Sequence, residues 1–194
     1  MIKINEERLW ETPLFNTNIG VDKEILDYLI NNKDEIQDTN EDMSAAWVSK
    51  TDLDFPTLKR TIEDFSRSLF AMNITEIKFT NMWANILKKG EYHLLHSHNE
   101  HTMSGAYYLQ TPVNSGQIYF KDPRPQTNSW TQKFIDKGNM RFYTPKPGDL
   151  FMWPSFLEHG TTPHGADEER IMLSFDLRFN GPGYKFGHNG YNGE

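Results

Sequence analysis

The sequence predicts a mainly β domain of the jelly-roll type, with helices from the N-terminal third packed on one of its sheets. After Asn73 the chain becomes a series of short apolar or alternating runs, rich in aromatic residues and bounded by Gly, Pro, Asn and Asp. Such runs are typical of antiparallel sandwiches and barrels. Before Asn73, two longer segments repeat their apolar residues at helical spacing. The runs predict strands over 76–88, 91–98, 103–110, 116–121, 140–144, 149–153 and 170–179.

The N-terminal third predicts one short strand and two helices. Residues 9–15 suit an edge strand, because an edge tolerates the proline that this segment contains. Residues 21–31 and 55–72 have helical periodicity, and Pro56 suits the first turn of the second helix. The polar and acidic stretch 32–44 predicts an exposed loop. We expect the two helices to support the β core.

The length of the chain predicts one domain. Its 194 residues lie within the usual range of a single domain. We expect a jelly-roll domain over residues 1–180, in which 1–72 support a β core over 73–180. A Gly- and Asn-rich flexible tail over 181–194 follows it. The connection 122–139 is longer than a hairpin loop usually is, which predicts a lid or a disordered loop.

The composition limits the classes of partner and compartment. Twenty Lys and Arg against 27 Asp and Glu give a net charge of -7, so the overall field disfavours a nucleic-acid partner. Cysteine is absent, which excludes disulfides, thiolate metal sites and cysteine nucleophiles, and fits a reducing cytoplasm. There is no apolar run of membrane-spanning length and no signal-peptide pattern. We therefore expect a cytoplasmic protein without a membrane partner; its oligomeric state stays open.

The segment from Tyr92 to His101 holds four of the seven histidines and is the most informative for function. On a strand, alternate side chains share a face, so His96 and His98 can bind one metal ion from one side. A third ligand must come from elsewhere. His159 follows a Pro-x-x-Gly-Asp turn and an apolar strand that would return it to the first two, leaving open coordination positions. The alternative is two histidines on a solvated strand.

The remaining histidines and one acid are weaker candidates. Glu100 has the parity of the His-x-His pair and could replace one of these ligands as a carboxylate. His93 has the opposite parity, and His101 is expected in the turn after the strand. His164 and His188 are expected at the surface.

Arg170 is the candidate for binding an anion. It comes eleven residues after His159 and opens an apolar strand, on which it shares a face with Met172 and Ser174. A planar guanidinium can hold a carboxylate through two hydrogen bonds. The alternative is an ion pair with the acids of 167–169. Three aromatic residues could line a substrate pocket or belong to the core. They are Tyr107, Tyr108 and Trp153.

Six short motifs follow one another in the second half of the chain. They are His96-Ser-His98, Ser104-Gly-Ala-Tyr-Tyr-Leu109, Asp122-Pro-Arg124, Pro147-Gly-Asp149, Pro154-Ser-Phe-Leu-Glu-His159 and Glu169-Arg-Ile171. This series resembles the 2-oxoglutarate and iron(II)-dependent oxygenases, and best a group of these with a His-x-His metal motif. The resemblance spans roughly residues 80–180, and the ordered series is more specific than any one motif.

The resemblance implies a double-stranded β-helix with Fe(II) at its open end, bound by His96, His98 and His159. It implies an oxidoreductase of the hydroxylase type, in which O2 and 2-oxoglutarate oxidise a small-molecule or peptidyl substrate and release succinate and CO2. The residues that it implies as contacts of 2-oxoglutarate are Arg170, Asn85 and Ser174.

Two positions depart from the pattern of the family. His98 stands where the family has an acid, which makes the site more positive by one charge. Met172 stands where many members have the serine of Arg-x-Ser, and Ser174 lies on the same face. Two alternatives stay open: a cupin-like three-histidine dioxygenase or isomerase without 2-oxoglutarate, suggested by Gly90 before the His-x-His, and a non-catalytic β-sandwich binding module.

Overall fold

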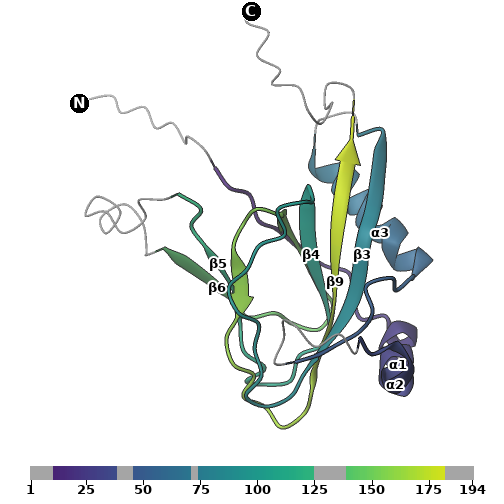
Figure 1. Cartoon of the computed structure of the whole chain (residues 1–194), viewed down its shortest axis with the longest axis vertical. Helices are drawn as coiled ribbons and strands as arrows, with labels where there is room; N and C mark the ends of the chain where they lie inside the picture. Colours follow the sequence, from purple (N-terminus) through teal and green to yellow (C-terminus); the bar gives the residue numbers. More distant parts are fainter. Residues whose placement is uncertain (1–10, 39–45, 71–73, 125–138, 182–194) are drawn as a thin grey trace, which may run out of the picture.

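A computed structural model of the chain describes residues 11–38, 46–70, 74–124 and 139–181. Within these ranges the strands form two antiparallel sheets, and the helices lie on the outer side of the larger sheet (Figure 1). The larger sheet has the order β1 (Phe15–Asn18), β7 (Asp149–Pro154), β4 (Met103–Gln110), β9 (Arg170–Asn180), β3 (Glu76–Leu87) and β2 (Trp47–Val48). The smaller sheet has the order β6 (Met140–Tyr143), β5 (Ile118–Lys121) and β8 (His159–Thr161). The predicted mainly β jelly roll is confirmed.

The helices are α1 (Lys23–Asn31), α2 (Lys33–Ile36) and α3 (Pro56–Leu69). Asp22 caps α1, because its carboxylate accepts two backbone N–H groups of the first turn. The helix α3 starts at a proline, whose missing N–H would have no partner in a first turn anyway. Its inward stripe packs on the larger sheet, and Ile62 at its centre is fully buried. The helices therefore cover one face of the sheet, as predicted.

The larger sheet separates two hydrophobic cores, because successive residues of its strands point to opposite faces. On the outer face, Tyr107 and Phe175 pack in the core that the helices cover. On the inner face, Tyr108 and Met172 pack against residues of β5 between the two sheets. Gly105 lets the outer core close tightly, since a Cβ there would lie 2.2 Å from the Phe175 ring. The inner face is the one that carries the candidate site.

The register of β9 places a row of polar side chains on the inner face. Because alternate residues share a face, Arg170, Ser174 and Asp176 lie on the same side of the strand as Met172. On the neighbouring β3, the residues paired with these four carry side chains on the same face. The pairs are Arg170 with Leu87, Met172 with Asn85, Ser174 with Trp83, and Asp176 with Asn81.

The segment 91–98 is not the predicted strand. Its one ladder contact is an antiparallel bridge between His96 and His159. Pairing does not continue in regular form, because the N–H of His93 is bonded to the Thr161 hydroxyl instead of a backbone carbonyl. This irregular segment nevertheless runs beside β8 and brings its histidines to the start of that strand.

Four further elements differ from the sequence prediction. The first strand begins at Phe15, where residues 9–15 were expected, and α2 lies in the stretch expected as a loop. The short strands β2 and β8 were not predicted. Both have three residues or fewer, so their sequences carry too little alternation to be recognised.

Several predictions fall on residues outside the described ranges. They include most of the expected lid over 122–139, the expected tail over 181–194 and His188. Among the described residues, no helix is long and apolar enough to cross a membrane.

Candidate metal and anion site

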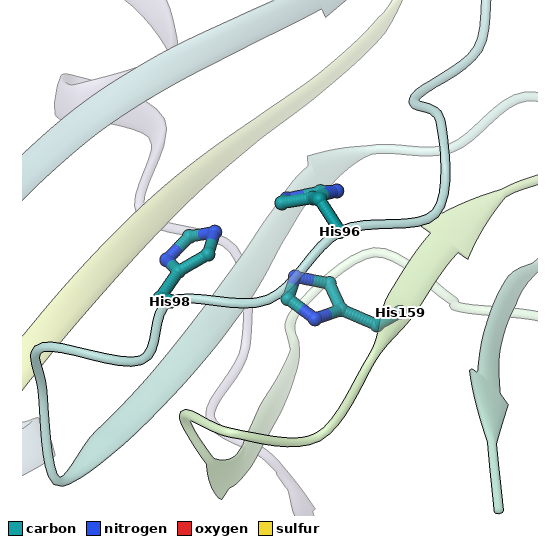
Figure 2. Close-up of side chains that lie close together, drawn as sticks. All are labelled: His96, His98 and His159. Atoms are coloured by element: carbon teal, nitrogen blue, oxygen red, sulfur yellow. The ribbon is translucent and has the colours of Figure 1, made fainter. Parts of the chain in front are cut away.

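Three histidines converge at the mouth of the inner face. His96 and His98 come from the irregular segment 91–98, and His159 opens β8 (Figure 2). The ring centroids are 4.4 Å apart for His96 and His159, 5.0 Å for His96 and His98, and 5.2 Å for His98 and His159. One nitrogen of each ring lies within 4.8 Å of those of the other two. Such a triangle fits three bonds to one metal ion.

Each of the three rings has its Nδ1 within hydrogen-bond distance of an oxygen. The pairs are His96 Nδ1 with the Leu94 carbonyl (2.7 Å), His159 Nδ1 with the Leu157 carbonyl (3.0 Å), and His98 Nδ1 with Asp176 Oδ1 (2.7 Å). These oxygens accept, so Nδ1 carries the proton in each neutral ring and Nε2 keeps a free lone pair. Two backbone carbonyls and the Asp176 carboxylate therefore select the tautomer that can bind a metal.

Burial keeps the imidazoles of His96 and His159 unprotonated. Removal from water, together with the smaller effect of the nearby His96, lowers the pKa of His159 to about 3. Burial likewise lowers the pKa of His96, against the hydrogen bond to Leu94, which raises it. A neutral imidazole is the form that binds metal. These rings are ready to bind at neutral pH without first losing a proton.

Aromatic side chains surround the histidines. Trp83 stacks on His98 at a centroid distance of 5.7 Å, and Trp153 meets His159 edge-on at 4.7 Å. Phe120 lies 6.2 Å from His159. These rings fix the orientation of the imidazoles and limit the access of water.

A small cavity of about 60 Å³ leads from the histidines into the inner face. Its wall includes His93, Tyr108 and Met172, together with Asn85 and Ser174. The Asn85 amide donates to the Ser174 hydroxyl at 2.9 Å, so these two residues form one polar patch in the wall. Asn85 on β3 and Ser174 on β9, which the resemblance implies as contacts of 2-oxoglutarate, therefore lie beside the histidines.

Arg170 is fully buried and only partly satisfied. Its Nη1 donates to the Ser115 carbonyl at 2.9 Å, whereas Nε and Nη2 have no hydrogen-bond partner among the described residues. The hydroxyl of Tyr108 and Nε2 of His93 are also buried without a partner in this part of the chain. A buried cation without a paired anion is costly. The geometry fits an anionic ligand.

The charge of Arg170 affects both of these neighbours. Burial, together with the smaller effects of the charges of Arg170 and His96, lowers the pKa of His93 to about 3. Burial raises the pKa of Tyr108 to about 12, although Arg170 opposes this shift. Tyr108 is thus a neutral hydroxyl donor and His93 a neutral ring at physiological pH.

Three sequence-based candidates lie elsewhere. Tyr107 does not line the cavity: it points to the helix side, where its hydroxyl donates to the Gly20 carbonyl and accepts from the Asp22 N–H. His164 is not at the surface, with 1% exposure and Nε2 bonded to the Glu168 carbonyl. Glu100, the alternative carboxylate ligand, is exposed and outside the histidine cluster. Tyr108 and Trp153, by contrast, line the cavity.

Asp176 is a site residue that the sequence reasoning missed. Its carboxylate bonds His98 and also accepts from the Ser104 hydroxyl at 2.6 Å and the Asn81 amide at 3.2 Å. Burial would raise its pKa, but the hydrogen bond and electrostatic interaction with His98 and the hydrogen bonds from Ser104 and Asn81 hold it below the usual range. The parity that joined Arg170 to Ser174 extends to Asp176 and could have revealed it.

The β core also matches a known protein family. Residues 81–176 match the model of a family described as "Putative 2OG-Fe(II) oxygenase". This β core is a 2OG-Fe(II) oxygenase-family domain. The matched residues include all three histidines, Arg170 and Asp176. No curated protein sequence matches the chain.

Solved structures of this class share the fold of the 2OG-Fe(II) oxygenase domain at low sequence identity. A prolyl-4-hydroxylase from Pseudomonas putida has a TM-score of 0.60 at 12% identity and covers 88% of this chain and 94% of its own. HygX from Streptomyces hygroscopicus, solved with nickel and 2-oxoglutarate, has a TM-score of 0.59 at 12% identity, covering 89% and 84%. The carbocyclase SnoK from nogalamycin biosynthesis reaches 0.63 at 12% identity, covering 92% and 85%.

Proposed function

We propose that this chain is an Fe(II)- and 2-oxoglutarate-dependent dioxygenase that oxidises a small-molecule or peptidyl substrate. His96, His98 and His159 would hold the metal, and Arg170 would hold the distal carboxylate of 2-oxoglutarate. One juxtaposition carries the proposal: three free imidazole nitrogens lie at one end of a cavity, near a buried guanidinium that has no anion among the described residues.

The donor set fits iron. Imidazole nitrogen is a common ligand of Fe(II), and three of them on one side leave positions open for a chelating co-substrate and O2. The Nδ1 hydrogen bonds fix the direction in which each Nε2 points, which is the usual device for orienting histidine ligands. Burial keeps His96 and His159 in the neutral form.

A carboxylate fits beside Tyr108 and His93 in the cavity wall, because both lie close enough to Arg170 for its charge to shift their pKa values. Arg170 offers Nε and Nη2, the two donors of one edge of the guanidinium, and this edge matches the two oxygens of a carboxylate. The Tyr108 hydroxyl can donate to the same group. Asn85 and Ser174 would face the middle of the co-substrate. HygX, a protein of similar fold, was solved with nickel and 2-oxoglutarate, which supports the choice of 2-oxoglutarate as the co-substrate.

The chemistry would be shared between the bound groups and the protein. When bound, Fe(II) and 2-oxoglutarate supply O2 activation, with conversion of 2-oxoglutarate to succinate and CO2. Trp83, Trp153 and Phe120 exclude water from the histidines, which limits side reactions. Arg170 and Tyr108 fix the orientation of the co-substrate.

The histidine-only ligand set also favours a second candidate, a cupin-like dioxygenase or isomerase that does not use 2-oxoglutarate. Arg170 discriminates between the two. A cupin-like enzyme has no need for a buried guanidinium with two unpaired donors, whereas a 2-oxoglutarate enzyme does.

Anaerobic titration with Fe(II) and 2-oxoglutarate tests the proposal. We expect a weak visible charge-transfer band of the chelate, and succinate formation after exposure to air. Arg170→Ala should weaken the band. The matched control is Arg178→Ala on the same strand, an exposed arginine whose loss should leave the band unchanged. If the wild type binds Fe(II) but shows neither the band nor succinate, the proposal is wrong, and the result favours the cupin-like alternative.

A further inference from the structure

We infer that Asp176 is the carboxylate of this metal site, acting through the His98 ring instead of on the metal. This inference rests on the proposed function, because it concerns the same ion. A site of three neutral imidazoles lacks the negative charge that the acid of the family supplies. Asp176 would return this charge from one bond further away.

The contacts of Asp176 fit a positioning residue. Its Oδ1 lies 2.7 Å from His98 Nδ1, on the far side of the ring from the free Nε2. The Ser104 hydroxyl donates to the same oxygen at 2.6 Å, and the Asn81 amide donates to Oδ2 at 3.2 Å. The carboxylate is therefore fixed from two neighbouring strands, and its side chain is 3% exposed.

The surrounding residues hold this arrangement in place. His101 Nε2 lies 3.6 Å from Asp176 Oδ2, and the Thr80 hydroxyl is bonded to His101 Nδ1 at 2.9 Å. Trp83 stacks on the other side of the site against the His98 ring. These contacts leave the His98 ring little freedom to turn. The ring therefore stays between the Asp176 carboxylate and the metal position, and the carboxylate does not reach the metal directly.

The consequence for the metal is chemical as well as geometric. A carboxylate that accepts the Nδ1 proton makes the imidazole a stronger ligand and gives it part of a negative charge. The other two ligands have neutral carbonyl acceptors instead. With Asp176 included, the site has the same net charge as one built from two histidines and an acid. His98 therefore replaces the acid of the family in position, and Asp176 replaces it in charge.

A double-mutant cycle on the metal alone tests this inference. Co(II), without 2-oxoglutarate, is titrated anaerobically into the full chain. Asp176→Asn keeps the shape and removes the charge, and should weaken Co(II) binding by about 10- to 100-fold. His98→Phe keeps a ring over Trp83 but has no nitrogen. In that background, Asp176→Asn should change the affinity by less than about threefold, because the two residues then act as one unit.

Each outcome decides between specific alternatives. If Asp176→Asn weakens Co(II) binding in the His98→Phe background as much as it does in the wild type, Asp176 acts as a direct ligand or through a long-range field. The inference is then overturned. If Asp176→Asn binds Co(II) like the wild type, it is overturned as well. If the wild type binds no Co(II), the proposed metal site itself fails, and this inference fails with it.

A measurement on the unmodified protein covers the case in which a variant fails to fold. In the zinc-loaded wild type, the ring N–H protons of the three ligands can be observed by NMR. We expect the His98 Nδ1 proton furthest downfield, since its acceptor is charged while the other two are carbonyls. A His98 proton no further downfield than those of His96 and His159 would overturn the inference.

Discussion

The metal end of the site (His96, His98 and His159) and its anion end (Arg170, Tyr108 and His93) differ in how completely their polar atoms are satisfied. At the metal end, each histidine Nδ1 has an acceptor, and only the lone pairs that face the ion remain free. At the anion end, Arg170, Tyr108 and His93 bury polar atoms that have no partner among the described residues. The metal end is organised by the fold itself, whereas the anion end is organised for a ligand and carries an energetic cost until the ligand binds.

The largest expected effect is loss of the metal on removal of a ligand. His159→Ala should weaken Co(II) binding by more than about 100-fold, because the two imidazoles that remain come from one short segment and cannot close the site. This loss of Co(II) affinity should exceed the 10- to 100-fold loss expected for Asp176→Asn, which removes only a residue that is hydrogen-bonded to a ligand. The measurement is Co(II) titration, with the thermal melt of the metal-free protein as a check on folding. Unchanged affinity in a folded His159→Ala protein would show that the metal end lies elsewhere.

The anion end should also make the metal-free protein sensitive to acid. His93 has a pKa of about 3 in the fold, below the 6.5 expected when unfolded. The unfolded chain therefore binds the proton first, so His93 favours folding above pH 6.5 and loses this contribution as the pH falls toward 3. Between pH 7 and 5 the loss should be about 2 kcal/mol.

The variant His93→Gln isolates this contribution, because glutamine stays neutral. Urea unfolding of both metal-free proteins at pH 7 and pH 5 gives the comparison. The wild type should lose about 2 kcal/mol more of its free energy of unfolding than the variant does. Equal losses in the two proteins would mean that His93 can accept a proton in the fold, and that the anion end is open to water.

A smaller effect distinguishes the two adjacent tyrosines. Tyr108→Phe removes a buried hydroxyl without a partner, so it should weaken 2-oxoglutarate binding by about 3- to 10-fold, equivalent to one hydrogen bond, without destabilising the free protein. Tyr107→Phe is the matched control. It loses bonds to Gly20 and Asp22, so it should cost about 1 kcal/mol of stability and leave 2-oxoglutarate binding unchanged. The opposite pattern would place the co-substrate on the wrong face.

Periodicity alone was sufficient to predict most of the fold. The helices over 21–31 and 55–72 and the strand pair at 76–88 and 170–179 have long, regular patterns, and the structure places them within a few residues. The segment 91–98 failed because its alternation of residues resembles a strand, whereas regular pairing requires a partner ladder that only the tertiary structure defines.

Site residues could be predicted where the spacing of motifs along the sequence determines which residues lie close together. They could not be predicted where the register of the strands determines which face a side chain points to. The motif series brought His96, His98, His159 and Arg170 to one side of the sheet. Alternation states that Tyr107 and Tyr108 face opposite ways, but it does not say which of them faces inward. Strand parity places Asp176 on the face of Arg170 and Ser174, but its bond to His98 depends on the direction of that ring, which no one-dimensional pattern contains.

The unsatisfied anion end is tested most directly by Arg170→Met. Methionine fills much of the space of the arginine stem without its charge. We predict that the metal- and 2-oxoglutarate-free variant unfolds at the same temperature as the wild type or higher, that Co(II) affinity changes by less than about threefold, and that 2-oxoglutarate binding is lost. A variant destabilised by about 3 kcal/mol or more would contradict the account, because that is the cost of removing one member of a satisfied buried ion pair.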